Sequence, residues 1–282
     1  MKKYKAAVCQ MDSGTDREKN LKSAEALIRE AADEGASLVV LPEMFSFLDR
    51  DCRAGAESVP GPTADFLCAQ AKKHGIWLAG GSFPCFSRSN PSNTLLFIDP
   101  DGNIRCRYSK LHMFDVEIED GISHRESETT SPGKNIVLSD TPLGRIGFAI
   151  CYDIRFGEMF KLMALNGAQL VCVAANFTLE SGAAHWESLL RARAIENGMY
   201  IAAADQCGQK TFMNSYGNSM IINPWGKVIA RLDKTPGIAC AEIDPDCVEK
   251  TRRQIPSLSN MRNDVYRLES TNVNIVKDPP SL

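Results

Sequence analysis

The sequence that decides the fold contains three strand-like stretches: GRIGFAI at 144–150, QLVCVA at 169–174 and YIAAAD at 200–205. Two segments with helical composition, 157–166 and 184–197, lie between them. A glycine follows each of these segments, and glycine is the residue that most often ends a helix. Strands that alternate with helices in this way predict an α/β layered fold.

The rest of the chain extends the same pattern. A strand is expected at 37–41, where residues 38–41 are continuously apolar, as expected for a central strand covered on both faces. An Asp-Gly pair at 101–102 indicates a hairpin turn. Further strands are expected at 4–11, 76–80, 93–99, 104–110, 220–223, 227–231 and 238–243, and further helices at 16–34, after Thr63 and after Asp244.

Length and composition limit the function classes. The chain has 282 residues, with 32 basic and 35 acidic residues and a net charge of −3, so it has no basic footprint for nucleic acid. Its longest apolar runs fall far short of the roughly 20 residues of a membrane span, and its N-terminus lacks the apolar run of a signal peptide. We expect a cytoplasmic protein with one domain over 1–282, whose residues from about 256 form an extended tail.

Cofactor and metal motifs are missing from the sequence. The ten cysteines contain no C-x-x-C pair, and the four histidines are scattered. No G-x-G-x-x-G, Walker loop, H-E-x-x-H or G-x-S-x-G is present. We therefore expect no cofactor and no metal. Most of the cysteines are interpreted as reduced, buried thiols.

Three reactive residues each follow an expected strand: Glu43, Lys110 and Cys151. Ligands bind at the carboxyl ends of strands in open α/β sheets. If the fold brings the three together, the carboxylate can take the thiol proton, the thiolate can attack a carbonyl, and the ammonium can hold the resulting oxyanion. Taken singly, each residue also fits a structural interpretation: a solvated loop glutamate, a surface lysine, a core cysteine. The flanking sequence decides between these interpretations.

Those flanks resemble a known family. LPEMF at 41–45, YSKLHMFD at 108–115 and GFAICYDIRF at 147–156 resemble, in order, the three signatures of the nitrilase superfamily of carbon–nitrogen hydrolases. Further similar stretches are AHWE at 184–187, RARA at 191–194 and NPWG at 223–226. The resemblance covers roughly residues 4–268. It implies a four-layer αββα sandwich that forms at least a homodimer, or a higher homo-oligomer, through the helices near 157–167 and 184–198, with the tail after Pro256 crossing over.

The resemblance also implies catalytic roles. Cys151 would be the nucleophile, Glu43 the general base and then acid, Lys110 the oxyanion stabiliser, and the backbone N–H of Tyr152 the second oxyanion donor. The family has a further glutamate ahead of a proline-glycine pair. Glu126 and Glu128 both precede Pro132-Gly133, and Glu126 is the preferred match.

The substrate class follows from the residues after the nucleophile. Nitrilases usually carry Cys-Trp-Glu there, whereas Cys-Tyr-Asp resembles the amidase branch with omega-amidases and deaminated-glutathione amidases. These enzymes cut an amide of a small molecule that bears carboxylates. Arg155 could clamp a carboxylate, with Phe177 and Ser181 shaping the pocket. The alternative for Arg155 is a structural ion pair with Glu158 or Asp153.

Several alternatives stay open. Residues 114–116 and 254–256 resemble omega-amidases, whereas 193–196 and 203–208 resemble deaminated-glutathione amidases. We prefer an omega-amidase acting on α-ketoglutaramate-like or succinamate-like substrates over the second group or another aliphatic or N-carbamoyl amidase. A thiol redox protein using Cys151 and a catalytically inactive binding protein are the alternatives from other classes. His112 and His185 are interpreted as structural.

Overall fold

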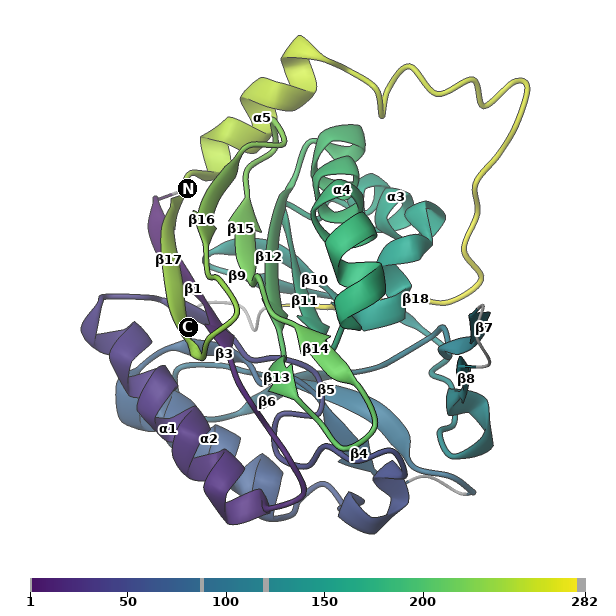
Figure 1. Cartoon of the computed structure of the whole chain (residues 1–282). Helices are drawn as coiled ribbons and strands as arrows, with labels where there is room; N and C mark the ends of the chain where they lie inside the picture. The colour runs from purple at the N-terminus through teal and green to yellow at the C-terminus, as the bar shows by residue number, and fades with distance from the viewer. Residues whose placement is uncertain (1, 87–88, 119–121, 278–282) are drawn as a thin grey trace.

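The computed structural model describes residues 2–86, 89–118 and 122–277. Two β-sheets pack face to face, and helices cover their outer faces, which gives four layers in the order αββα (Figure 1). Contacts between β1 and β12, between β2 and β11 and between β6 and β9 join the two sheets. The α/β class and the four-layer arrangement expected from the sequence are confirmed.

The first sheet is built from the N-terminal part of the chain and one late strand. Its strands are β17 (Gly237–Ile243), β1 (Tyr4–Gln10), β2 (Leu38–Val40), β3 (Trp77–Ala79), β5 (Ser92–Ile98), β4 (Phe83–Cys85) and β6 (Ile104–Ser109). Strands β1, β2 and β3 are parallel, so their carboxyl ends share one edge. Strands β5 and β6 form the hairpin expected around Asp101-Gly102.

The second sheet carries the segment that decides the fold. Its order is β16 (Val228–Arg231), β15 (Met220–Ile222), β12 (Tyr200–Asp205), β11 (Leu170–Ala175), β10 (Gly144–Ile150), β9 (Ile136–Thr141) and β18 (Val273–Val276). Strands β10, β11 and β12 are parallel. The end of β10, where the chain turns after Ile150, therefore lies beside the end of β11.

Helices cover the outside of both sheets. Helices α1 (Arg17–Asp33) and α2 (Pro62–His74) pack on the first sheet, and α3 (Gly157–Leu165) and α4 (Leu179–Asn197) pack on the second. Helix α5 (Pro245–Gln254) follows β17. Within the described residues, no helix is both long enough and apolar enough to cross a membrane. The remaining elements are β7 (Asp115–Ile118), β8 (Ile122–Arg125), β13 (Cys207–Gln209), β14 (Asn214–Tyr216) and the 3-10 turns η1 (Cys52–Gly55), η2 (Glu126–Glu128) and η3 (Cys151–Arg155).

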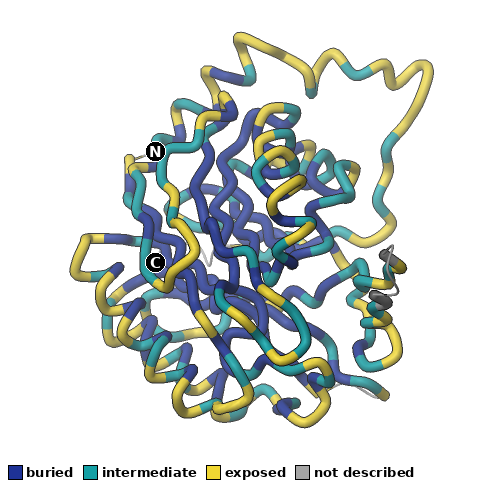
Figure 2. Tube along the Cα trace, in the orientation of Figure 1, coloured by how far each residue is buried: buried dark blue, intermediate teal, exposed yellow. Residues whose placement is uncertain are grey.

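The core follows from the alternation of side chains along each strand. In β1, Ala6 and Val8 face the second sheet, whereas Ala7 and Cys9 face α1 and α2. Both faces are buried, which explains why the central strands are continuously apolar. Figure 2 shows the buried residues concentrated in the sheets and the exposed ones on the helices and loops.

Several segments differ from the sequence-based expectation. Strands β4, β7, β8, β9, β13 and β14 were not expected, and two further segments depart from their predicted form. Helix α4 begins at Leu179 rather than 184, because the side chain of Thr178 accepts a hydrogen bond from the backbone N–H of Ser181 and caps the helix. The tail after Pro256 is mostly exposed up to residue 272, then adds β18 to the edge of the second sheet beside β9 (Figures 1 and 2). The backbone hydrogen bonds of this edge strand come from a distant segment, which a local pattern does not reveal.

Candidate active site

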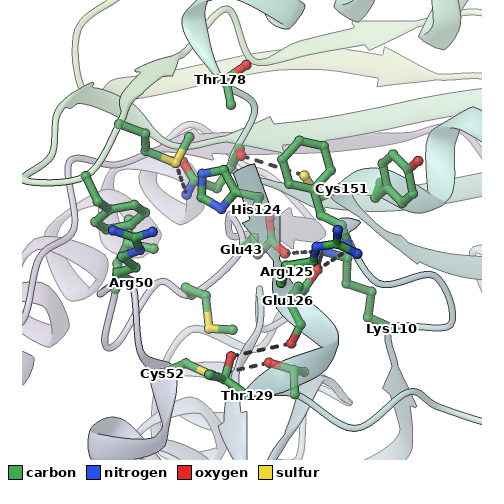
Figure 3. A pocket seen from close by; sticks show the side chains of 18 of the residues that line it. Glu43, Arg50, Cys52, Lys110, His124, Arg125, Glu126, Thr129, Cys151 and Thr178 are labelled. Carbon is green, nitrogen blue, oxygen red and sulfur yellow. Dashed lines mark hydrogen bonds and ion pairs between the residues drawn. The ribbon is translucent and has the colours of Figure 1, made fainter. Parts of the chain in front are cut away.

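The fold brings Glu43, Lys110 and Cys151 together between the two sheets. Glu43 follows β2 and Lys110 follows β6 in the first sheet, and Cys151 follows β10 in the second. The Nζ atom of Lys110 lies 3.1 Å from Oε1 of Glu43, and the Cys151 thiol lines the same cavity and donates to the backbone carbonyl of Asn176, with an Sγ–O distance of 3.7 Å. All three are buried, with exposed fractions of 5%, 2% and 8%. The three strand-end residues thus form one site (Figure 3).

The backbone is left-handed at two of these strand ends. Cys151 has a φ of 46° and Met44, next to Glu43, has a φ of 53°. Such values cost energy for residues other than glycine and persist only where the surroundings impose them. Cys151 also begins the 3-10 turn η3, whose first N–H groups have no partner inside the turn. The Tyr152 N–H therefore lies in a position where an oxyanion could use it.

A second carboxylate contacts Lys110. Oε2 of Glu126 lies 2.7 Å from the Lys110 Nζ and also accepts the N–H of Phe114 at 2.7 Å. Glu128, its neighbour in the sequence, is exposed, and its backbone carbonyl accepts a hydrogen bond from Asn90. The sequence could not decide whether Glu126 or Glu128 is the second glutamate near the site, and in the structure Glu126 is the one that contacts Lys110.

Burial and charge set the protonation states of the site. Burial raises the pKa of Glu43, and the nearby Lys110 only partly offsets this. Burial also raises the pKa of the Cys151 thiol, and the Glu43 charge adds to the increase. Burial alone would lower the pKa of Lys110, but Glu126 and Glu43 raise it well above its usual value. The resting site therefore holds an ammonium and a neutral thiol next to the group that can take its proton.

Asn93 is a site residue that the sequence did not indicate. Its Nδ2 donates to Oε1 of Glu43 at 2.7 Å, and its backbone carbonyl accepts the Lys110 N–H at 2.9 Å. It lies near the start of β5, where a polar residue has no distinguishing pattern. No local signal could have identified it, because the contact with Glu43 spans 50 residues.

A cavity of about 550 Å³ opens above the three residues. Apolar side chains from two loops, one after β2 and one between β13 and β14, line part of it: Met44, Leu48, Phe212 and Met213. Arg50 and Cys52 lie on the wall opposite Lys110 and Cys151 (Figure 3). Cavities of this size typically hold small organic ligands, with a few polar groups that fix their orientation.

Arg155, Phe177 and Ser181 all line this cavity. The guanidinium of Arg155 lies 5.5 Å from the ring centroid of Phe177 and 5.8 Å from that of Tyr152. Ser181 Oγ lies 2.7 Å from the hydroxyl of Thr178, which the sequence did not single out.

Arg155 does not form the ion pair that was its structural alternative. Among the described residues it pairs with neither Asp153 nor Glu158, and its Nη1 lies 3.2 Å from the ring nitrogen Nδ1 of His185. A cationic group without a carboxylate partner inside a cavity is suited to bind an anionic ligand. The described residues contain no group of three or more histidine, cysteine or acidic side chains placed to hold a metal ion.

Comparisons with known proteins agree with this geometry. The omega-amidase NIT2 of Danio rerio is 38% identical over 273 residues, which cover 96% of this chain and 99% of that protein. The crystal structure of the Caenorhabditis elegans NitFhit protein has a TM-score of 0.87 at 39% identity, covering 96% of this chain and 68% of that one. Saccharomyces cerevisiae Nit3, described as a member of branch 10 of the nitrilase superfamily, has a TM-score of 0.83 at 31% identity over 93% of this chain and 96% of that one.

The family model described as carbon-nitrogen hydrolase matches residues 5–253. This range contains both sheets apart from β18 and the first residue of β1, as well as Glu43, Lys110, Glu126 and Cys151. The sequence motifs, the four-layer fold and the matched range all lead to one assignment. The chain belongs to the carbon–nitrogen hydrolase family, whose members hydrolyse amides and related carbon–nitrogen bonds.

Proposed function

We propose that this chain is an omega-amidase: it hydrolyses the terminal amide of a small carboxylate-bearing molecule such as α-ketoglutaramate or succinamate. The observation that carries the proposal is the guanidinium of Arg155, which lies in the same cavity as Cys151 and has no carboxylate partner among the residues that the structure describes. The similarity to omega-amidases along nearly the whole of both chains supports it.

The first half-reaction forms a thioester. Glu43 takes the thiol proton, and the sulfur of Cys151 bonds to the amide carbon. The negative charge that develops on the amide oxygen is stabilised by the Lys110 ammonium and the N–H of Tyr152. Glu43 then gives its proton to the leaving nitrogen. The carbon–nitrogen bond breaks, and ammonia departs.

The second half-reaction restores the thiol. Water attacks the thioester carbon while Glu43 accepts a proton from it, and the same two donors hold the oxyanion. The carbon–sulfur bond breaks, the sulfur regains the proton from Glu43, and the product leaves as a carboxylic acid. Each proton that Glu43 accepts is returned, so one buried carboxylate serves both steps.

Matched substrates test this proposal. Succinamate and butyramide have the same chain length, but only succinamate carries a carboxylate. We expect ammonia release from succinamate and α-ketoglutaramate at a much higher kcat/KM than from butyramide, and none from any of them with Cys151→Ala. Arg155→Gln should lower kcat/KM for succinamate roughly 10- to 100-fold, because a charge-assisted hydrogen bond contributes about 1.5–3 kcal/mol. It should leave butyramide nearly unchanged.

Arg50→Gln provides the comparison for the opposite wall of the cavity. If Arg50→Gln rather than Arg155→Gln removes the preference for succinamate, the carboxylate binds at the other wall. If the wild type shows no preference, or if Cys151→Ala stays active, the proposal is wrong. Hydrolysis of deaminated glutathione in preference to both carboxylate amides would move the protein to the other amidase group.

We also propose a homodimer that forms through α3 and α4. Leu165 and Ile195 on these helices are 45% and 52% exposed, and Trp225, in the turn beside Ile195, is 56% exposed. Large exposed apolar side chains on helices that pack together are typical of an interface. Sedimentation should give twice the chain mass for the wild type and the single chain mass for Ile195→Glu. A wild-type monomer at micromolar concentration would exclude the dimer.

The cytoplasm is the compartment we propose. The ten cysteines are all free thiols in the structure, which suits a reducing environment. Fractionation of the source cells, followed by detection of the protein, would test this. Recovery in an oxidising compartment would contradict it.

A further inference from the structure

The most completely bonded carboxylate near the site is Asp153, two residues after Cys151. It is fully buried and accepts four hydrogen bonds. Its Oδ2 accepts from the Tyr108 hydroxyl at 2.6 Å and from the Ile150 N–H at 2.9 Å. Its Oδ1 accepts from the N–H of His112 at 3.1 Å and contacts the His112 Nδ1 at 2.7 Å. Each oxygen therefore has two partners.

These partners come from both sides of the site. Tyr108 and His112 lie two residues before and two residues after Lys110, on the segment that leaves the first sheet. Ile150 ends β10 of the second sheet just before Cys151, and Asp153 lies two residues after Cys151 in the 3-10 turn η3. The Asp153 carboxylate thus connects residues 108–112, which include Lys110, to the turn that begins at Cys151. The ring of Phe156 stacks on His112 with a centroid distance of 3.6 Å and closes the network on one side.

We propose that Asp153, acting through Tyr108 and His112, is the positioning residue that sets the Lys110 ammonium relative to the Cys151 thiol and the Tyr152 N–H. The proposal rests on the catalytic roles proposed above. The two oxyanion donors come from different sheets, so their spacing depends on a rigid connection between the sheets. A catalytic group displaced by about 1 Å can cost a factor of about 100 in rate.

The chemistry of the network explains why the residue is an aspartate. A buried carboxylate is costly unless its oxygens are satisfied, and four donors satisfy it here. An asparagine in the same place can offer one oxygen as acceptor, and its NH₂ would face donors. At least two of the four donors would lose their acceptor. The Ile150 hydrogen bond also closes the turn around Cys151, whose left-handed backbone needs such support.

A network of this kind could instead serve stability alone, so the test must separate the two roles. Asp99 is the matched control, because it is also a buried aspartate, accepts the backbone N–H groups of Asp101 and Asn103, and lies at the far end of the β5–β6 hairpin from Lys110. Asp99→Asn should lower the melting temperature without changing kcat per folded molecule.

Asp153→Asn and Tyr108→Phe are the test variants, measured by kcat and by the alkylation rate of Cys151 with iodoacetamide. Alkylation needs no substrate, so it reports on the site even if the proposed substrate is wrong. We expect kcat to fall roughly 100-fold for Asp153→Asn. Alkylation of Cys151 at neutral pH should slow about tenfold, because a displaced ammonium stabilises the thiolate less. The pH profile of the alkylation rate should move to higher pH for the same reason. Tyr108→Phe should show the same changes to a smaller extent.

His112 supplies a rescue experiment that keeps the proposal testable if Asp153→Asn fails to fold. The amide nitrogen of Asn occupies the place of the histidine Nδ1, so His112→Asn keeps the donor and His112→Leu removes it. We expect His112→Asn to retain most of the kcat and alkylation rate that His112→Leu loses. Equal behaviour of these two variants would overturn the proposal. So would wild-type kcat and alkylation in Tyr108→Phe.

Discussion

Glu126→Gln tests what the second carboxylate that contacts Lys110 contributes to catalysis. The substitution preserves the shape of the side chain but replaces a charged acceptor with a neutral one in two hydrogen bonds, each of 2.7 Å. Hydrogen bonds to a charged group contribute about 1.5–3 kcal/mol and neutral ones about 0.5–1.5, so the bond from the Phe114 N–H loses roughly 1–1.5 kcal/mol. The bond from Lys110 keeps its charged donor but loses the attraction of an ion pair, for which we take a loss of the same order. The two together amount to about 2–3 kcal/mol. When the whole loss raises the free energy of the transition state, kcat/KM falls roughly 30- to 150-fold, because each 1.36 kcal/mol is a factor of ten in rate.

The assay is ammonia release from succinamate, with a melting curve for each variant to count folded molecules. Glu128→Gln changes the same residue type two positions away, where the side chain lines the same cavity but is exposed and forms no ion pair with Lys110, so we expect less than a threefold change. The reasoning would be refuted by a Glu126→Gln enzyme within threefold of the wild type. Equal losses in the two variants would also refute it, because they would show that contact with Lys110 is not what matters.

Three further predictions concern pH, thiol reactivity and stability. Because burial raises the pKa of Glu43 above its ordinary 4.5 and the base acts only when ionised, kcat/KM should fall as pH decreases through a midpoint above 4.5; a midpoint below 4.5 would contradict this. Burial raises the thiol pKa of Cys9 and Cys172, so neither should react with iodoacetamide in the native protein. Rapid labelling of either residue, detected by peptide mass spectrometry, would contradict their burial. Phe97→Ala removes a ring in the core between the sheets that stacks on Trp77 with a centroid distance of 5.2 Å. Urea unfolding should show a free energy of unfolding lower by about 3–5 kcal/mol, and a decrease under 1 kcal/mol would contradict the packing.

The sequence predicted the parts of the molecule that depend on local pattern. The strand predicted at 37–41 is β2, and the predicted helix beginning near Asp16 is α1, with the Asp16 side chain accepting the Lys19 N–H as an N-cap. The strand-end positions of Lys110 and Cys151 followed from the same pattern. These features are local because side-chain period and capping residues act over a few positions.

The contacts that complete the site could not be predicted in this way. Asn93 meets Glu43 across 50 residues, and Tyr108 meets Asp153 across 45. Such pairs depend on how the two sheets pack, which no local pattern encodes. Strand β18 is a similar case, since its sequence is unremarkable and its pairing with β9 supplies its backbone hydrogen bonds. The choice between Glu126 and Glu128 also needed the position of Lys110 in space.

The central claim is that Cys151 carries the acyl group during turnover. The most direct test is to quench the enzyme with acid in the first turnovers of succinamate and to locate the adduct by peptide mass spectrometry. We predict a succinyl thioester on Cys151, on none of the other nine cysteines, with one ammonia released per acylated chain. Ammonia release without any adduct, or with the adduct on another residue, would contradict the claim.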